Sequence, residues 1–279
     1  MKDTWLFVDS GHCAPSFNMA LDEALLNWHS LGKIPPVLRF YGWEPAGISV
    51  GFFQKVDGQI DLEGARKYGI ELVRRQTGGK AVLHDQELTY SVIVSEEHPA
   101  MPKSIKEAYL VLSKGLLEGY KELKIDAEFA TPGSAGMKTG SAVCFEEPSW
   151  YELVIEGKKA AGSAQTRKSG VILQHGSIPL EIDEIKLFDL FLYPSERAKE
   201  RARKAFGNRA VAINDVLPSA VSFEQAKAAF KKGFEQGLDI DLQPYELPPL
   251  LLEEVSILEK KYKSEDWNNL RERKEVHQP

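Results

Sequence analysis

Short runs of β-forming residues, linked by turns and interrupted by amphipathic helices, constrain the fold of this chain more than any other feature. The runs PVLRFYGW (36–43) and GISVGFFQ (47–54) are separated by a Glu-Pro turn, and ELVRR (71–75) and residues 87–94 flank a glycine-rich loop. Three further runs, at 149–156, 158–165 and 170–180, follow one another, with Glu156-Gly157 as the first turn. Links this short predict an α+β fold with a mixed, largely antiparallel sheet flanked by helices, and not a doubly wound nucleotide fold.

Helix signals lie between and after these runs. Four predicted helices have a capping residue at their expected start: Ser16, Asp61, Ser104 and Ser222. The first of them is expected to stop at Gly32, and the pattern turns mainly helical from about residue 184. We predict one main domain over residues 1–245 and a helical C-terminal extension over residues 246–279.

Composition and charge exclude several classes of protein. The 279 residues, 43% of them hydrophobic, are enough for a sizeable core, and the net charge of −6 argues against a general nucleic-acid binder. No apolar stretch approaches the roughly 20 residues needed to cross a bilayer. The two cysteines, Cys13 and Cys144, form no disulfide framework and suit a reducing compartment. We expect a cytoplasmic protein with neither a nucleic-acid nor a membrane partner.

Two segments resemble known nucleophile and nucleotide-binding motifs, but they lack the neighbouring residues or the helix that those motifs require. GISVG (47–51) matches the G-x-S-x-G elbow, but the residues after Gly51 are not helical, so Ser49 is expected to be an ordinary strand residue. TGGK resembles a phosphate-binding loop, yet Arg74 and Ala81 stand where Gly and Ser or Thr are required. The histidines lack metal-ligand spacing. Neither a metal nor another cofactor is required by the sequence.

The segment RRQTGGKAVLHD (74–85) carries more information. Gly78 and Gly79 allow positive φ and let backbone amides approach a ligand, Arg74 and Arg75 can hold an anion, and His84 can donate to a carbonyl. A glycine hairpin with solvated arginines is the alternative interpretation. The spacing alone leaves both open.

Cys144 lies at the end of a Gly/Ser-rich segment and before Glu146 and Glu147, which is no apolar strand. A free thiol is mostly protonated at neutral pH, so a nucleophilic Cys144 needs a nearby cation. Lys159 is a candidate, but pairing across the Glu156-Gly157 turn alone does not bring the two together. An inert cysteine and a solvated lysine remain the alternatives. Cys13, ahead of the first helix, ranks below Cys144.

Three linked motifs resemble the superfamily of lipoate–protein ligases, biotin ligases and octanoyltransferases: RRQTGGKAVLHDQELTYSVIV, EGKKAAGSAQTR and VILQHGSI. The resemblance spans roughly residues 5–245 and implies a biotin/lipoate ligase-like catalytic domain. The segment from Cys144 to Glu152 narrows the resemblance to one group within this superfamily. It is similar to the C-F-x-x-P-S-x-Y-E pattern of LipM-type octanoyltransferases.

The resemblance implies a specific chemistry. Cys144 would accept an octanoyl group from octanoyl-acyl carrier protein, and a lysine of a lipoyl domain, expected to be that of the glycine cleavage H protein, would then take it. Lys159 would be the second catalytic residue. The implied substrate-binding residues are Arg75, Thr77, Gly78, Gly79, His84, Gly162, Ser163, Ala164, Gln165, His175 and Gly176.

Three other activities fit parts of the same pattern. A related amidotransferase class places its cysteine at the same position but takes octanoyl from H protein. An ATP-dependent lipoate–protein ligase shares the lysine and needs no catalytic cysteine. A non-catalytic module that binds carrier domains would need neither Cys144 nor Lys159.

Overall fold

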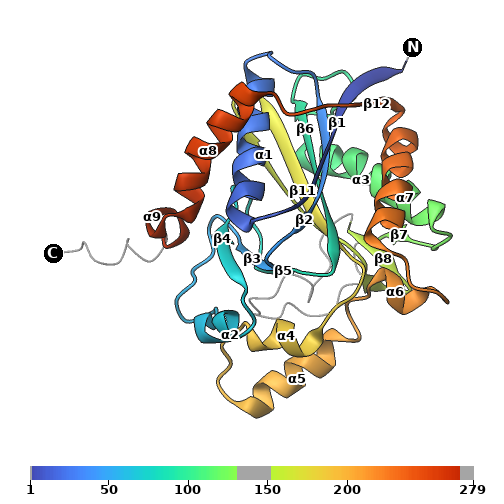
Figure 1. Cartoon of the computed structure of the whole chain (residues 1–279). Coiled ribbons are helices and arrows are strands. Elements are labelled where there is room, and N and C mark those ends of the chain that lie inside the picture. The colour runs from blue at the N-terminus through green and yellow to red at the C-terminus, as the bar shows by residue number, and fades with distance from the viewer. Residues whose placement is uncertain (1, 131–151, 271–279) are drawn as a thin grey trace.

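A six-stranded mixed sheet forms the centre of the computed structural model, which describes residues 2–130 and 152–270 (Figure 1). In spatial order its strands are β10 (Gly162–Lys168), β11 (Val171–Pro179), β6 (Glu87–Ser95), β2 (Val37–Trp43), β1 (Asp3–Cys13) and β12 (Ile240–Pro244). The first four strands pair antiparallel, whereas β1 pairs parallel with both β2 and β12. The predicted α+β fold with a mixed, largely antiparallel sheet is confirmed.

Helices cover both faces of this sheet. Helices α1 (Pro15–Ser30) and α8 (Pro249–Lys263) lie on one face, and α3 (Ile105–Glu122) and α7 (Phe223–Leu238) lie on the other. Successive strand residues point to opposite faces, so in β2 Val37 and Tyr41 pack toward α1 while Leu38 and Phe40 pack toward α3 and α7. Among the described residues, no helix is both long enough and apolar enough to span a membrane.

Two smaller sheets complete the fold. Strands β3 (Gly47–Val50), β4 (Glu71–Arg74) and β5 (Val82–His84) form one, and β7 (Glu128–Phe129), β8 (Leu153–Ile155) and β9 (Lys158–Lys159) form the other. The first packs with three helices around a separate apolar cluster: α2 (Leu62–Lys67), α4 (Glu184–Asp189) and α5 (Glu196–Phe206). The short helices α6 (Ile213–Val216) and α9 (Glu265–Asn268) follow later in the chain.

Three of the four predicted helix caps are confirmed. Asp61, Ser104 and Ser222 each accept a hydrogen bond from a backbone amide of the first turn. The prediction for Ser16 is wrong, because α1 begins at Pro15 with Ala14 as its N-cap. Proline suits the first helical position, so the helix starts earlier than the hydroxyl residue suggests.

The run 158–165, predicted as one strand, is divided between two sheets. Lys158 and Lys159 pair with β8 across the predicted Glu156-Gly157 turn, whereas the chain from Gly162 onward joins the main sheet. The predicted strand 47–54 is also shorter, because it ends at Val50. At the next position a Cβ on Gly51 would lie 1.9 Å from the carbonyl oxygen of Gly79, so the backbone turns there in close contact with the glycine loop.

Candidate functional site

A pocket with about 430 Å³ of empty space, part of it open to solvent, lies where α1 crosses the central sheet and the β3–β5 sheet. Its walls come from eight segments distributed between residues 19 and 177. The lining residues are Met19, Tyr41, Trp43, Ser49, Arg75, Gly79, Val82, His84, Thr89, Gly162, Ser163, Ala164, His175, Gly176 and Ser177.

Most of the predicted substrate-binding residues meet in this pocket. Those in its lining are Arg75, Gly79, His84, Gly162, Ser163, Ala164, His175 and Gly176. Thr77 lies behind the wall, with its Oγ1 2.7 Å from Nε2 of His175. The Gly78 carbonyl accepts a hydrogen bond from Arg75 at 2.8 Å. Gln165 lies apart from the lining residues and donates from its side-chain amide to Gln174 at 3.0 Å.

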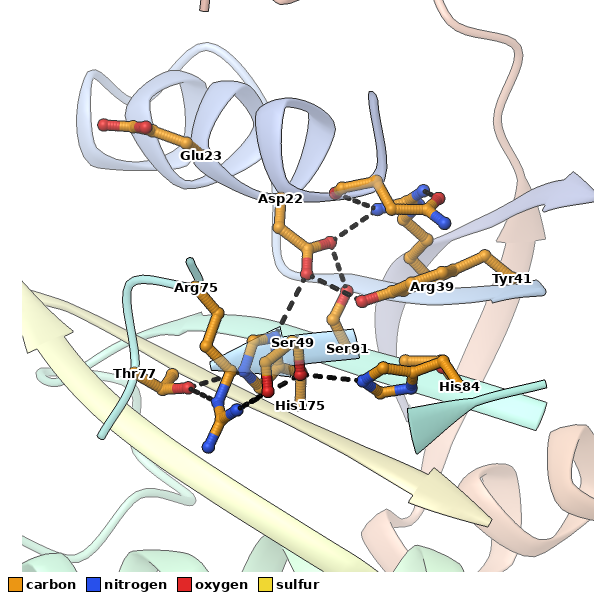
Figure 2. Close-up of polar contacts among 12 residues, drawn as sticks. Asp22, Glu23, Arg39, Tyr41, Ser49, Arg75, Thr77, His84, Ser91 and His175 are labelled. Atoms are coloured by element: carbon orange, nitrogen blue, oxygen red, sulfur yellow. Dashed lines mark hydrogen bonds and ion pairs between the residues drawn. The ribbon is translucent and has the colours of Figure 1, made fainter. Parts of the chain in front are cut away.

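A buried carboxylate on α1 organises one side of the pocket. Asp22 accepts hydrogen bonds from Arg39 at 2.7 Å, from Ser91 at 2.8 Å and from the hydroxyl of Tyr41 at 3.1 Å, and its Oδ2 lies 3.4 Å from Nδ1 of His175 (Figure 2). Burial by itself raises the pKa of Asp22, but the charge of Arg39 and the contact with His175 outweigh it and hold the pKa below its usual value. Asp22 is therefore a fixed negative charge next to His175.

The glycine loop continues this network on the other side. Arg75 donates to the Ser49 carbonyl at 2.8 Å and to Thr77 Oγ1 at 3.1 Å, and thus ties β3 to the loop (Figure 2). Ser49 lies in β3, as predicted, and its hydroxyl lines the pocket. Arg74 and Arg75 are 0% and 4% exposed, so the alternative of a hairpin with solvated arginines is wrong.

His84 lines the same side of the pocket as a neutral imidazole. Its ring stacks on Trp43 with the centroids 4.0 Å apart, Nε2 lies 2.8 Å from Ser49 Oγ, and Nδ1 lies 3.2 Å from Oε1 of Glu87. Burial lowers the pKa of His84 below its ordinary value of 6.5, although Glu87 opposes the shift. A neutral ring supplies one donor and one acceptor, which matches its two polar partners.

Lys159 lies at the start of the segment that leads into the pocket wall. It is 2% exposed, and its Nζ lies 2.6 Å from Oε1 of Glu152, which is itself 5% exposed. Its backbone is fixed on both sides, since its amide donates to Arg209 at 2.7 Å and its carbonyl accepts from Val211 at 3.0 Å. A buried ammonium is costly unless it is well paired, so the contact with Glu152 offsets part of the cost of burying Lys159.

Of the two cysteines, the structure describes only Cys13. Cys144 lies outside the described residues. Cys13 donates from Sγ to the Ser10 carbonyl at 3.2 Å, and burial raises its pKa despite the nearby charge of Arg39. A raised thiol pKa leaves little thiolate at neutral pH, which makes Cys13 a poor nucleophile.

Sequence reasoning missed the polar residues that support the pocket, above all Asp22 and Arg39. A signal was present, because Asp22 stands inside the apolar helical run MALDEALL and Arg39 inside the strand run VLRFYGW. A charge at a position whose neighbours are buried requires a partner. Two such isolated charges of opposite sign would have suggested this pair.

Comparison with known proteins assigns the chain to a family. Residues 14–235 match the model of the lipoyl protein ligase A/B catalytic domain. The octanoyltransferase LipM of Bacillus subtilis is 59% identical over 96% of this chain and 98% of its own length, and that of Staphylococcus aureus is 53% identical over 96% and 99%. The bipartite lipoate protein ligase of Thermoplasma acidophilum has a similar structure, with a TM-score of 0.79, 26% identity, and coverage of 99% of this chain and 100% of that one. These matches confirm the resemblance to LipM-type octanoyltransferases, and the chain belongs to the lipoyl protein ligase A/B catalytic domain family.

Proposed function

We propose that this protein is an octanoyltransferase of protein lipoylation. It takes an octanoyl group from octanoyl-acyl carrier protein as a thioester on Cys144 and passes it to a lysine of a lipoyl domain, that of the glycine cleavage H protein first of all. The observation that carries this proposal is that the buried Lys159 stands three residues before Gly162, the first of the three β10 residues that line the pocket. The names of the full-length relatives support the same activity.

The first step is a thioester exchange. The Cys144 thiolate attacks the octanoyl carbonyl carbon, a new carbon–sulfur bond forms, and the bond to the phosphopantetheine sulfur breaks. The released phosphopantetheine thiolate takes up the proton that the Cys144 thiol gave up. Lys159 supplies the positive charge that favours the thiolate and the negative charge on the carbonyl oxygen in the transition state.

The second step forms the amide. The neutral amine of the acceptor lysine attacks the octanoyl carbon and the bond to Cys144 Sγ breaks. The proton that the nitrogen loses passes to the Cys144 thiolate, which restores the free thiol of the enzyme. Because a thioester is already activated, neither step requires ATP, in contrast to ligation of a free acid.

The pocket provides the binding energy for the acyl chain. Met19, Trp43 and Val82 present apolar surface, and burial of a methylene gains about 0.8 kcal/mol. The supporting charges, Asp22 with Arg39, are already paired with each other. An uncharged chain therefore enters without separating an ion pair, which suits an octanoyl group.

Detection of an acyl-enzyme by intact mass spectrometry tests this proposal. Incubation with octanoyl-acyl carrier protein should add the mass of one octanoyl group to the intact protein, and neutral hydroxylamine should remove it. Cys144→Ala should abolish the adduct, and the matched control Cys13→Ala should retain it. Absence of an adduct, or its persistence in Cys144→Ala, would overturn the proposed intermediate.

Two further arms of the same assay separate the rival activities. Octanoyl-H protein in place of the acyl carrier protein should load Cys144 poorly; efficient loading from it alone would identify an amidotransferase. Free octanoate with ATP should load nothing. ATP-dependent modification of the H protein would instead indicate a ligase, and binding of carrier domains without any transfer would indicate a binding module.

A further inference from the structure

The C-terminal helices α8 and α9 contact the outer side of the pocket at two places. Asp22 and Arg75 point into the site, and the residue next to each of them in sequence, Glu23 and Arg74, points away toward these helices. Figure 2 shows Asp22 directed toward His175 and Glu23 directed away from it, and Figure 1 shows α8 beside α1 and α9 next to β4.

The contact at Glu23 fixes α8 on the pocket helix. Its carboxylate accepts from Tyr262 at 2.7 Å and from Lys261 at 2.6 Å, and Lys168 of β10 lies 3.2 Å away. Burial alone raises the pKa of Glu23, but the hydrogen bonds from Lys261 and Tyr262 outweigh it and keep the pKa low. Glu254 adds a second attachment by accepting from the indole of Trp28 at 2.8 Å. Helix α8 is thus attached to α1 along its length.

The contact at Arg74 is more extensive. Its backbone amide donates to Asn268 Oδ1 at 2.8 Å, its guanidinium donates to the Asn268 carbonyl at 2.6 Å, and its carbonyl accepts from the indole of Trp267 at 2.8 Å. The same guanidinium donates to the carbonyls of Gly51 at 2.8 Å and Gln54 at 2.6 Å. Arg74 lies at the end of β4, directly before the glycine loop. It therefore joins α9 both to β4 and to the segment from Gly51 to Gln54.

These segments adjoin the residues Ser49, Arg75 and Gly79 that line the pocket. The amide of Arg75 donates to Val50 at 3.0 Å, and the amide of Phe52 donates to Thr77 at 2.8 Å. Gly51 approaches the Gly79 carbonyl too closely to accept a side chain. Because backbone is fixed to backbone here, a shift of Arg74 has to move Thr77 and with it the contact to His175.

We propose that Trp267 and Asn268 are positioning residues for the acyl pocket. They act through Arg74 and keep the loop 75–79 in the conformation that lines the pocket, so the C-terminal helices belong functionally to the acyl site. This inference rests on the proposed function for its kinetic consequence, but the structural coupling can be measured without any activity.

Full-length Trp267→Phe, Asn268→Ala and Asn268→Asp test it, with Asn269→Ala as the matched control on the same turn. Trp267→Phe keeps an aromatic ring and removes the donor to Arg74. Both Asn268 variants lose the donor to the Tyr262 carbonyl, but only Asn268→Asp keeps the acceptor for the Arg74 amide, so the two together isolate that acceptor. We expect faster amide exchange over residues 75–79 in Trp267→Phe and Asn268→Ala, with restored protection in Asn268→Asp. The KM for octanoyl-acyl carrier protein should rise about tenfold and kcat change far less, since the chemistry is untouched.

Unchanged exchange over residues 75–79 in folded Trp267→Phe and Asn268→Ala would overturn the inference. So would an equal effect of Asn269→Ala, because that result would indicate a general loss of stability. If the wild-type protein transfers no octanoyl group at all, the proposed function fails, and the exchange measurement still decides whether α9 positions the loop.

Discussion

At the scale of single residues, the pocket is defined by polar groups whose charge state is fixed by burial and pairing. Asp22 stays ionised because Arg39 is beside it, and His84 stays neutral because it is buried against Trp43. The two groups lie at opposite ends of a chain of contacts through His175, Thr77, Arg75 and Ser49. Such a network is rigid only while every member is paired.

His84 should make folding stability depend on pH. Its pKa is lowered in the folded protein, so below the ordinary value of 6.5 the unfolded chain binds a proton that the folded chain resists. The free energy of unfolding should therefore fall as the pH drops through this range, by up to about 1.4 kcal/mol per pH unit. Urea unfolding at pH 7.5 and pH 5.5 measures the slope.

A His84→Gln variant provides the comparison for that slope. Glutamine can still hydrogen-bond but does not titrate, so its unfolding free energy should vary less between the two pH values. An identical slope in wild type and variant would show that His84 is not the group responsible.

Met19 should influence the length of the acyl chain that the pocket accepts. It is 3% exposed and lines the pocket from α1, so Met19→Ala should leave space for a longer chain. Burial of two more methylenes gains about 1.6 kcal/mol, so kcat/KM for decanoyl relative to octanoyl donor should rise about tenfold. Leu25→Ala, on the same helix and outside the lining residues, should lose stability without changing this preference.

At the scale of elements, the close contact of α3 with α7 fixes one face of the central sheet. A Cβ on Gly233 of α7 would lie 2.2 Å from the amide nitrogen and 2.4 Å from the Cα of Gly119 on α3. Backbone cannot yield as a flexible side chain can. The two helices therefore depend on glycine at this crossing to reach the sheet together.

Gly233→Ala should force these helices apart. We expect a loss of about 1–3 kcal/mol in the free energy of unfolding, the usual cost of overpacking. Gly207→Ala is the control, because there the added Cβ meets only the end of the Glu184 side chain and the φ of −58° suits any residue. Equal stability of the two variants in urea would contradict the packing argument.

Local sequence signals predicted the elements better than their assembly. Turn and cap residues such as Asp61 and Ser222 act within a few residues, so their positions can be read directly. The division of 158–165 between two sheets could not be predicted, because it depends on partners far away in the chain: the Ala160 carbonyl accepts from Tyr120 on α3. Asp22 and Arg39 could be recognised in part, because each is an isolated charge in an apolar run, but the geometry of their pairing needs α1 to lie across β2.

Part of the site could also be predicted from the sequence, because some of its residues form local motifs. The resemblance identified the loop and strand residues that line the pocket, since these are consecutive motifs. It did not reveal that Arg75 is bound internally to Ser49 and Thr77, nor that Lys159 is paired with Glu152. The roles of Cys144 and Lys159, and the boundary at residues 245 and 246, remain predictions.

At the scale of the whole molecule, three apolar clusters meet around one pocket. The α1/α8 cluster includes the lining residues Met19, Tyr41 and Trp43, and the cluster around β3 includes Val82. Tyr90 of the α3/α7 cluster donates to the lining residue Ser163 at 2.7 Å. Segments from residue 19 to residue 177 line it, and the helices beyond residue 248 hold two of those segments from behind. The acyl pocket is therefore expected to depend on segments from both ends of the described chain.

The proposed reaction passes the octanoyl group through Cys144 and needs no ATP. The most direct measurement is a single-turnover chase: octanoyl-enzyme, separated from all donor, is mixed with H protein without nucleotide, and both proteins are weighed by intact mass spectrometry over time. The octanoyl mass should leave the enzyme as it appears on the H protein, one for one. Octanoyl-enzyme that persists while fresh donor still modifies the H protein would contradict the proposed reaction.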